Sequence, residues 1–264
     1  MIFYFLSVLA ALALFVISIA LIGAGARLRN RQDGPAGAQV NVASYSAIEA
    51  GLFGLFGLLL AFTFSGALAR FDERRQAIVI EANAISAAYR GLGLLPADAR
   101  DRLRGSMREY LAARIEEQRQ PHGFVEIQAN ELEKRQRSAK LQREIWDGIL
   151  SVHASAPRDS LDSLDQVLLP AVNEVFSVAR SRTALAVRHP PLMIYLALFA
   201  LAGVCSLVSG YEMGRPLSWV HALSFAASLA LGLFLILEIE FPRQGSVRLD
   251  IYDAVLANSL NDVP

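Results

Sequence analysis

Two glutamates that close an apolar segment near the end of the chain carry its most distinctive chemistry. Glu238 and Glu240 follow an uncharged run at residues 219–237. A carboxylate buried at the end of a membrane helix is destabilising unless a cation or another partner compensates its charge. We therefore predict either a bound hard cation or a salt bridge at this pair, with Arg243 or Arg248 as the partner in the second case.

Glu49 is another acidic residue at the edge of an apolar segment, which extends over residues 52–69. If several copies of the chain surrounded a pore, a ring of Glu49 carboxylates would concentrate cations at its mouth. A single Glu49 would instead stabilise the positive end of a helix dipole. The sequence leaves both interpretations open.

Residue spacing does not support enzymatic chemistry. The four histidines lie far apart and form no metal-binding motif with one another or with the single cysteine, Cys205: they are His122, His153, His189 and His221. The sequence contains no recognisable nucleophile–base pair or phosphate-binding loop. We predict that the protein is not an enzyme and needs no cofactor, with a cation at the two terminal glutamates as the one candidate ligand.

The composition is typical of a membrane protein and not of a nucleic-acid binder. Of 264 residues, 54% are hydrophobic, and 25 Lys and Arg balance 25 Asp and Glu to a formal net charge of +0. Binding to phosphate backbones needs clustered positive charge. The apolar residues are concentrated in four uncharged runs, each close to the roughly 20 residues that cross a bilayer core.

We predict four transmembrane helices, at residues 2–22, 48–70, 191–209 and 219–238. No proline interrupts residues 47–90, so the second helix should continue from lipid into water. Residues 72–189 are charged and carry apolar residues at helical spacing. The fold class that follows is an all-α membrane protein with a helical cytosolic domain inserted between the second and third transmembrane helices.

The inserted domain should contain helices at residues 97–118 and 124–153 and a further helix from about residue 159. Pro170 should kink this last helix, because an interior proline removes a hydrogen bond and clashes one turn back. The predicted division of the chain is 1–71 for the first two transmembrane helices, 72–189 for the domain, 190–240 for the last two, and 241–264 for a polar cytosolic tail.

Arginines indicate which side of the membrane the domain occupies. More of them flank the domain and the chain end than the opposite loops, where Arg27, Arg29, Arg31 and Arg215 lie. The positive-inside rule therefore predicts a cytoplasmic domain and, with an even number of crossings, cytoplasmic termini.

Two passages resemble those of a known family. Residues 57–90 read GLLLAFTFSGALARFDERRQAIVIEANAISAAYR, and residues 238–248 read EIEFPRQGSVR. Together with the four-crossing layout, they resemble the bacterial bestrophin-like domain proteins, whose layout is that of the bestrophin ion channels. The likeness implies a homo-oligomer in the bacterial inner membrane, a pentamer as in bestrophins, with the second helix lining the pore.

The same likeness assigns roles along the second helix. The sequences align on the pair Phe71 and Asp72, which together with Arg70 forms a membrane-exit motif. The alignment carries the pore constriction over to three residues: Gly54, Leu58 and Phe62. Residues four apart share a helix face, and a narrow apolar ring gates a pore by dewetting. For any single phenylalanine, the alternative is packing against lipid or a neighbouring helix.

The leading functional prediction is therefore a homo-oligomeric ion channel. Its partners would be the lipid bilayer, other copies of the chain and permeant inorganic ions, with no nucleic acid. The alternative is a membrane-anchored scaffold whose helical domain binds a cytosolic protein, which the charge-dense helix at residues 124–153 favours. Oligomeric state separates the two, because a monomer has no central pore.

A membrane-impermeant thiol reagent tests the predicted orientation. Because the arginine excess places the domain in the cytoplasm, an Arg137→Cys variant should be labelled only after cells are opened. The native Cys205 lies in an apolar run and serves as the background control. Labelling of the variant in intact cells would reverse the orientation.

Overall fold

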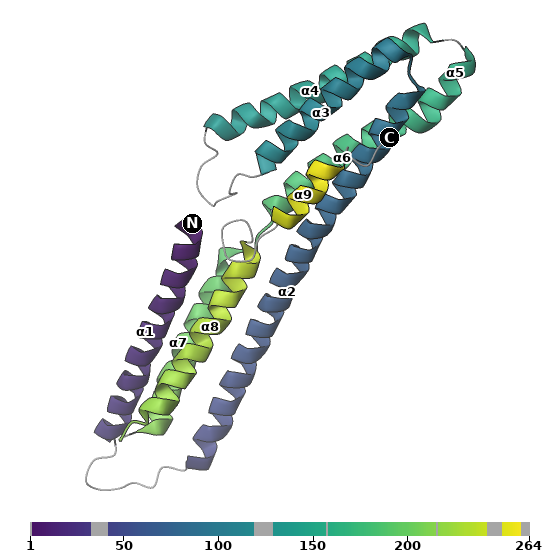
Figure 1. Ribbon diagram of the computed structural model, residues 1–264. Helices are drawn as coiled ribbons and strands as arrows, with labels where there is room; N and C mark the ends of the chain where they lie inside the picture. The colour runs from purple at the N-terminus through teal and green to yellow at the C-terminus, as the bar shows by residue number, and fades with distance from the viewer. Residues whose placement is uncertain are drawn as a thin grey trace. The chain divides into compact units, whose positions relative to one another are not determined.

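The computed structural model describes residues 2–32, 42–118, 129–156, 158–214, 216–241 and 250–259. All regular elements in these ranges are helices (Figure 1). The chain divides into two compact units, Met1–Phe71 with His189–Val247 and Asp72–Arg188 with Arg248–Pro264. The predicted fold class is confirmed, since helices α3–α6 come between the second and third of four long apolar helices.

The first unit is built from α1 (Ile2–Gln32), the first part of α2 (Val42–Gly91), α7 (Leu192–Met213) and α8 (Trp219–Glu240). Each is long and apolar enough to cross a membrane. Helix α1 continues well past its predicted end at residue 22. Arg29 explains part of this extension, because its guanidinium donates to the carbonyls of Tyr211 and Glu212 at the end of α7, at 3.3 and 2.8 Å.

Helices α1 and α7 approach each other closely where each presents a glycine. A Cβ atom added at Gly25 would clash with the Leu207 carbonyl oxygen, and one at Gly210 would clash with the Ile22 carbonyl oxygen. No side chain fits between backbones at this separation. Small residues at such positions are what allows membrane helices to pack closely.

Gly25→Ala should destabilise the protein in detergent, because the new methyl group meets backbone atoms that cannot move aside as a side chain can. We expect a loss of roughly 1–3 kcal/mol in the free energy of unfolding, as for other overpacked sites. Gly23→Ala on the same helix is the matched control, since nothing lies within 4 Å of its added Cβ. Equal unfolding midpoints for the two variants would contradict the close crossing.

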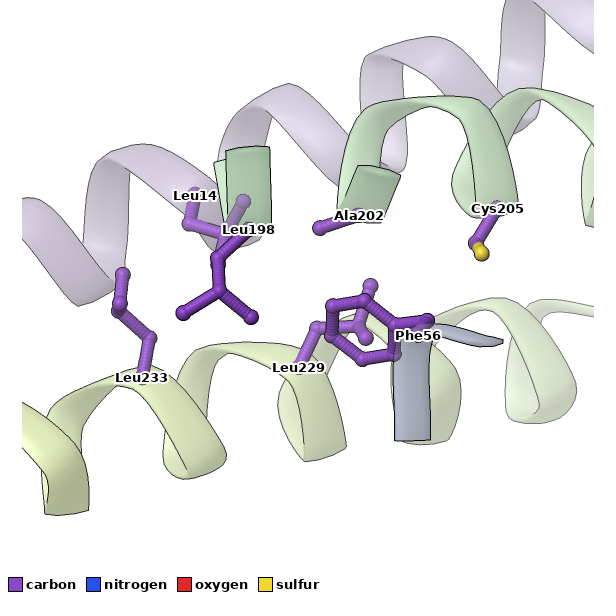
Figure 2. Close-up of a cluster of buried hydrophobic side chains, with 7 residues drawn as sticks. All are labelled: Leu14, Phe56, Leu198, Ala202, Cys205, Leu229 and Leu233. Carbon is purple, nitrogen blue, oxygen red and sulfur yellow. The ribbon is translucent and has the colours of Figure 1, made fainter. Parts of the chain in front are cut away.

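All four helices contribute to the apolar core of the first unit (Figure 2). Its buried members are Leu14 of α1, Phe56 of α2, Leu198, Ala202 and Cys205 of α7, and Leu229 and Leu233 of α8. Phe56 is the buried residue that α2 contributes to this core, and Figure 2 shows its ring beside Leu229. The lone cysteine is an ordinary buried core residue.

The second unit contains the rest of α2, the 3₁₀ turn η1 (Leu92–Leu94), α3 (Ala97–Gln118), α4 (Ala129–Ser155), α5 (Arg158–Ser163), the π-helical turn η2 (Leu164–Leu168), α6 (Leu169–Ala186) and α9 (Asp250–Asn258). The helix predicted at residues 97–118 is confirmed by α3. Its apolar face is buried, with Leu103, Met107 and Tyr110 almost without exposure. The predicted start of the next helix at residue 124 lies outside the described residues.

At Pro170, where the sequence predicts a kink, the structure has the π-helical turn η2 directly before α6. The backbone N–H of Leu169 bonds to the carbonyl of Leu164, five residues back. A proline lacks an N–H and its ring clashes with the carbonyl four residues earlier, here that of Gln166. One widened turn therefore accommodates Pro170 without ending the helix.

Helix α9 lies in the segment that the sequence analysis treats as a polar tail. Leu256 is fully buried, α9 packs against α3, and the Ser86 hydroxyl donates to the Ser259 carbonyl at 2.6 Å. A nine-residue helix is too short for its periodicity to be recognised in the sequence.

Candidate functional site

One face of the apolar part of α2 packs against α7 and α8. Phe56, Thr63 and Ala67 are buried on this face. Beside them, the Phe53 ring lies 5.4 Å from the Phe225 ring, centroid to centroid, and the Leu60 side chain lies over Gly232. The neighbouring helices therefore hold α2 from one side.

The predicted constriction residues lie on the other side of α2. Gly54 and Leu58 are each two residues from Phe56, which places them about 160° from it around the helix axis, and Phe62 is about 120° from it. All three are exposed in the single chain, Leu58 by 53% and Phe62 by 67%. The structure thus brings Gly54, Leu58 and Phe62 together in one row that no other part of the described chain covers.

Glu49, the predicted pore-mouth residue, does not belong to this row. It lies seven residues before Phe56, which is about 20° from Phe56 around the helix. The structure therefore places Glu49 on the packed side of α2, where it is half-buried.

The membrane-exit motif divides between the two sides of α2 in the same way. Arg70 is about 40° from Phe56 and its side chain is 21% exposed, whereas Asp72 is about 160° away and its side chain is 57% exposed. Asp72 pairs loosely with Arg75, at 3.9 Å, and Phe71 is half-buried. Only Arg70 is in position to reach a buried partner.

That partner is Glu240, whose carboxylate is completely buried at the end of α8. Arg70 donates from Nε and Nη2 to Glu240 Oε2, at 3.0 and 2.7 Å, and His189 Nδ1 lies 3.0 Å from Oε1. The His189 ring also stacks on Phe241, with centroids 4.8 Å apart. A buried carboxylate is thus joined to a guanidinium from α2 and to an imidazole directly before α7. We call these three residues the Glu240 clamp.

Glu238, two residues before Glu240 on α8, is also buried and has a different partner. The Ser7 hydroxyl of α1 donates to its Oε1 at 2.7 Å. The sequence predicts either a cation or a salt bridge at these glutamates, and Arg70 supplies the bridge to Glu240. The two arginines named for that role, Arg243 and Arg248, lie outside the described residues.

Sequence reasoning missed the roles of His189 and Arg70 as partners of Glu240. Arg70 stands out only as the charged residue that ends an apolar run, and such a residue needs a partner near the membrane. His189 has no neighbouring metal-type ligand in the sequence, so its spacing gives no signal. Among the described residues, no group of three or more His, Cys, Asp and Glu side chains is arranged to hold a metal ion.

The second unit has a buried charged cluster of its own around Glu81 of α2. Glu81 is fully buried and accepts hydrogen bonds from Arg114 of α3 at 2.8 Å and from Arg182 of α6 at 2.6 Å. Arg114 also donates to Glu117 at 2.9 Å. Burial alone would lower the pKa of the Arg114 guanidinium, but the Glu81 carboxylate outweighs it and raises that pKa. These charges neutralise one another and join three helices, which is a structural role.

Comparison with known proteins identifies the family. A family model described as a bestrophin-like domain matches residues 12–250, which is most of the chain. The chain belongs to the bestrophin-like domain family. Among curated proteins, none matches the chain at a significant level.

Solved structures agree with this bestrophin-like fold. A variant of a bacterial bestrophin homolog from Klebsiella pneumoniae superposes with a TM-score of 0.67 at 16% identity, over 96% of this chain and 97% of that chain. Another structure of the Klebsiella homolog gives 0.65 at 16% identity, covering 96% of each chain. A solved membrane protein gives 0.67 at 15% identity over 96% of this chain and 98% of that chain. At these identities the likeness establishes the fold alone.

Glu240→Gln should strongly destabilise the bestrophin-like chain, because Arg70 would keep its charge in a largely buried place without a carboxylate. We expect a loss of roughly 3–5 kcal/mol in the free energy of unfolding, the range for removing one partner of a buried pair. Thermal unfolding in detergent measures it.

Arg75→Gln is the control for this variant, because its pair with Asp72 is long and half-exposed and should contribute little. The double variant Arg70→Gln/Glu240→Gln should be more stable than the sum of the two single losses predicts. Strict additivity of the two losses would show that the pair is not coupled.

Proposed function

We propose that this chain is a bestrophin-like ion channel, and not an enzyme, that assembles as a homo-oligomer with α2 lining the pore. The observation that carries the proposal is the low burial of α2. Only 17% of the apolar 18-residue stretch of α2 is buried within the chain, whereas the corresponding fractions are 28% for α1, 33% for α7 and 28% for α8. A membrane helix held from one side has its other side available to a pore or to further copies of the chain.

The residues on the uncovered side suit a constriction. Gly54 brings no side chain, whereas Leu58 and Phe62 would form apolar rings that exclude water when narrow. Leu58 faces most directly away from the packed side, and Phe62 lies at the flank of the row. A pentamer, as the family likeness suggests, would repeat these rings five times around one axis, with inorganic ions as the permeant species.

The family likeness supports the bacterial inner membrane, and the arginine distribution supports a cytoplasmic second unit with both termini in the cytoplasm. The Glu240 clamp would hold α2 at Arg70, just after its apolar part, so that the constriction residues keep their orientation. Glu49 would contribute to the pore mouth only if its side chain reached around from the packed side of α2.

Removing the Phe62 ring should raise conductance or open probability severalfold in planar bilayers, because a wider and less apolar ring fills with water more readily. Leu58→Ala should act in the same direction. Since Phe62 is 67% exposed in the chain, its truncation should change monomer stability little.

Phe53→Ala is the matched control. Its ring packs against Phe225, so its truncation should lower stability and leave the current through folded channels nearly unchanged. If Phe62→Ala only destabilises the protein, or if the wild type runs as a monomer in mild detergent and never conducts, the channel proposal fails. The membrane-anchored scaffold, with α4 as its charged binding surface, would then take its place.

A further inference from the structure

Two arginines at the corner between α2 and α3 have an unusual environment within the second unit. The turn η1 reverses the chain after α2, and α3 then brings Arg104 and Arg108 to the ring of Tyr89. Their guanidinium carbons lie 4.8 and 5.5 Å from the ring centroid, and Arg108 Nη2 donates to the Tyr89 hydroxyl at 2.5 Å. The buried tyrosine thus holds two cations that are one helical turn apart.

Nothing in the described part of the chain neutralises these two charges. No described carboxylate forms an ion pair with Arg104 or Arg108, and Asp101, one turn before Arg104, bonds to Arg100 instead. Within the same described residues, Arg104 Nε is buried without a hydrogen-bond acceptor. Like charges one turn apart on a helix repel, and a buried donor normally has a protein, water or ion partner.

The buried arginines of the second unit, in contrast to the half-buried Arg104 and the exposed Arg108, are satisfied by the chain itself. Arg114 and Arg182 both meet Glu81, and Arg74 donates to the carbonyl of Arg188 at 2.8 Å. Tyr89, Arg104 and Arg108 form what we call the Tyr89 corner, where the two arginines have no described carboxylate as a partner. The exposed Arg90 adds a further positive charge next to Tyr89 in sequence. The corner therefore carries positive charge that is held in place and not compensated.

We propose that the Tyr89 corner binds a phosphate-type oxyanion between Arg104 and Arg108. The planar guanidinium fork matches the spacing of phosphate oxygens, and such charge-assisted bonds are strong. The anion would accept hydrogen bonds from the guanidinium groups of both arginines and relieve the repulsion between the two cations. Either a soluble phosphate compound or an anionic lipid headgroup supplies this chemistry. The proposal does not depend on whether the chain conducts ions.

Calorimetric titration of the full-length protein with inorganic pyrophosphate, in phosphatidylcholine nanodiscs at constant ionic strength, tests the site. We expect saturable binding by the wild type and a loss of roughly tenfold or more in affinity for Arg104→Gln and for Arg108→Gln. Arg143→Gln is the matched control, because this exposed arginine of α4 bonds to the Ala139 carbonyl and should bind as the wild type does.

Folding of the variants is checked in the same preparations. Because Arg104 Nε lacks an acceptor in the chain, Arg104→Gln without pyrophosphate should unfold at the wild-type temperature or above it. Nanodiscs that contain phosphatidylglycerol distinguish the two sources, since a lipid headgroup in the site would block pyrophosphate and a soluble ligand site would still titrate. Absence of saturable binding in phosphatidylcholine, or equal affinities of the Arg104→Gln and Arg143→Gln variants, would overturn the site.

Discussion

A charge that lies at the end of an apolar helix must find a partner, and this constraint determines how the first unit holds α2. Glu240 is completely buried, so its carboxylate requires donors close by. Arg70 and His189 provide them from two other parts of the unit. The pairing fixes the rotation of α2 about its own axis, because Arg70 can reach Glu240 only when its side of the helix faces α8. That rotation determines which residues of the apolar part of α2 face the other helices and which are exposed.

The same side of α2 carries buried polar groups along much of its length. Thr63, Arg70, Arg74 and Glu81 are separated by seven, four and seven residues, which keeps them on one side of the helix. Their partners differ: Thr63 bonds back to the Leu59 carbonyl, Arg70 meets Glu240, and Glu81 meets two arginines. In each unit, therefore, α2 is positioned by polar contacts whose geometry is more specific than apolar packing.

Apolar length and helical spacing were enough to predict the four membrane helices and α3, because both signals are local in the sequence. The rotation of α2 is not predictable from the sequence, since residues 52–69 are uncharged and apolar residues occur on every side of the helix. The sequence alone therefore could not show that Glu49 lies on the packed side of α2, and its role at a pore mouth stays a prediction. The partner of Glu240 was missed for a related reason: Arg70 is 170 residues away in sequence, and nearer arginines satisfied the same charge argument.

The division of α2 into two sides has a consequence for how its residues can vary. Substitutions on the packed side disturb buried pairs or the core around Phe56, so they act first on folding. Gly54, Leu58 and Phe62 are exposed in the single chain, so substitutions there should affect its folding little. The environment of these three positions therefore lies outside the single chain, whether it is lipid, another copy or a water-filled pore. The polar contacts that hold α2 on one side thereby leave Gly54, Leu58 and Phe62 exposed on the other side.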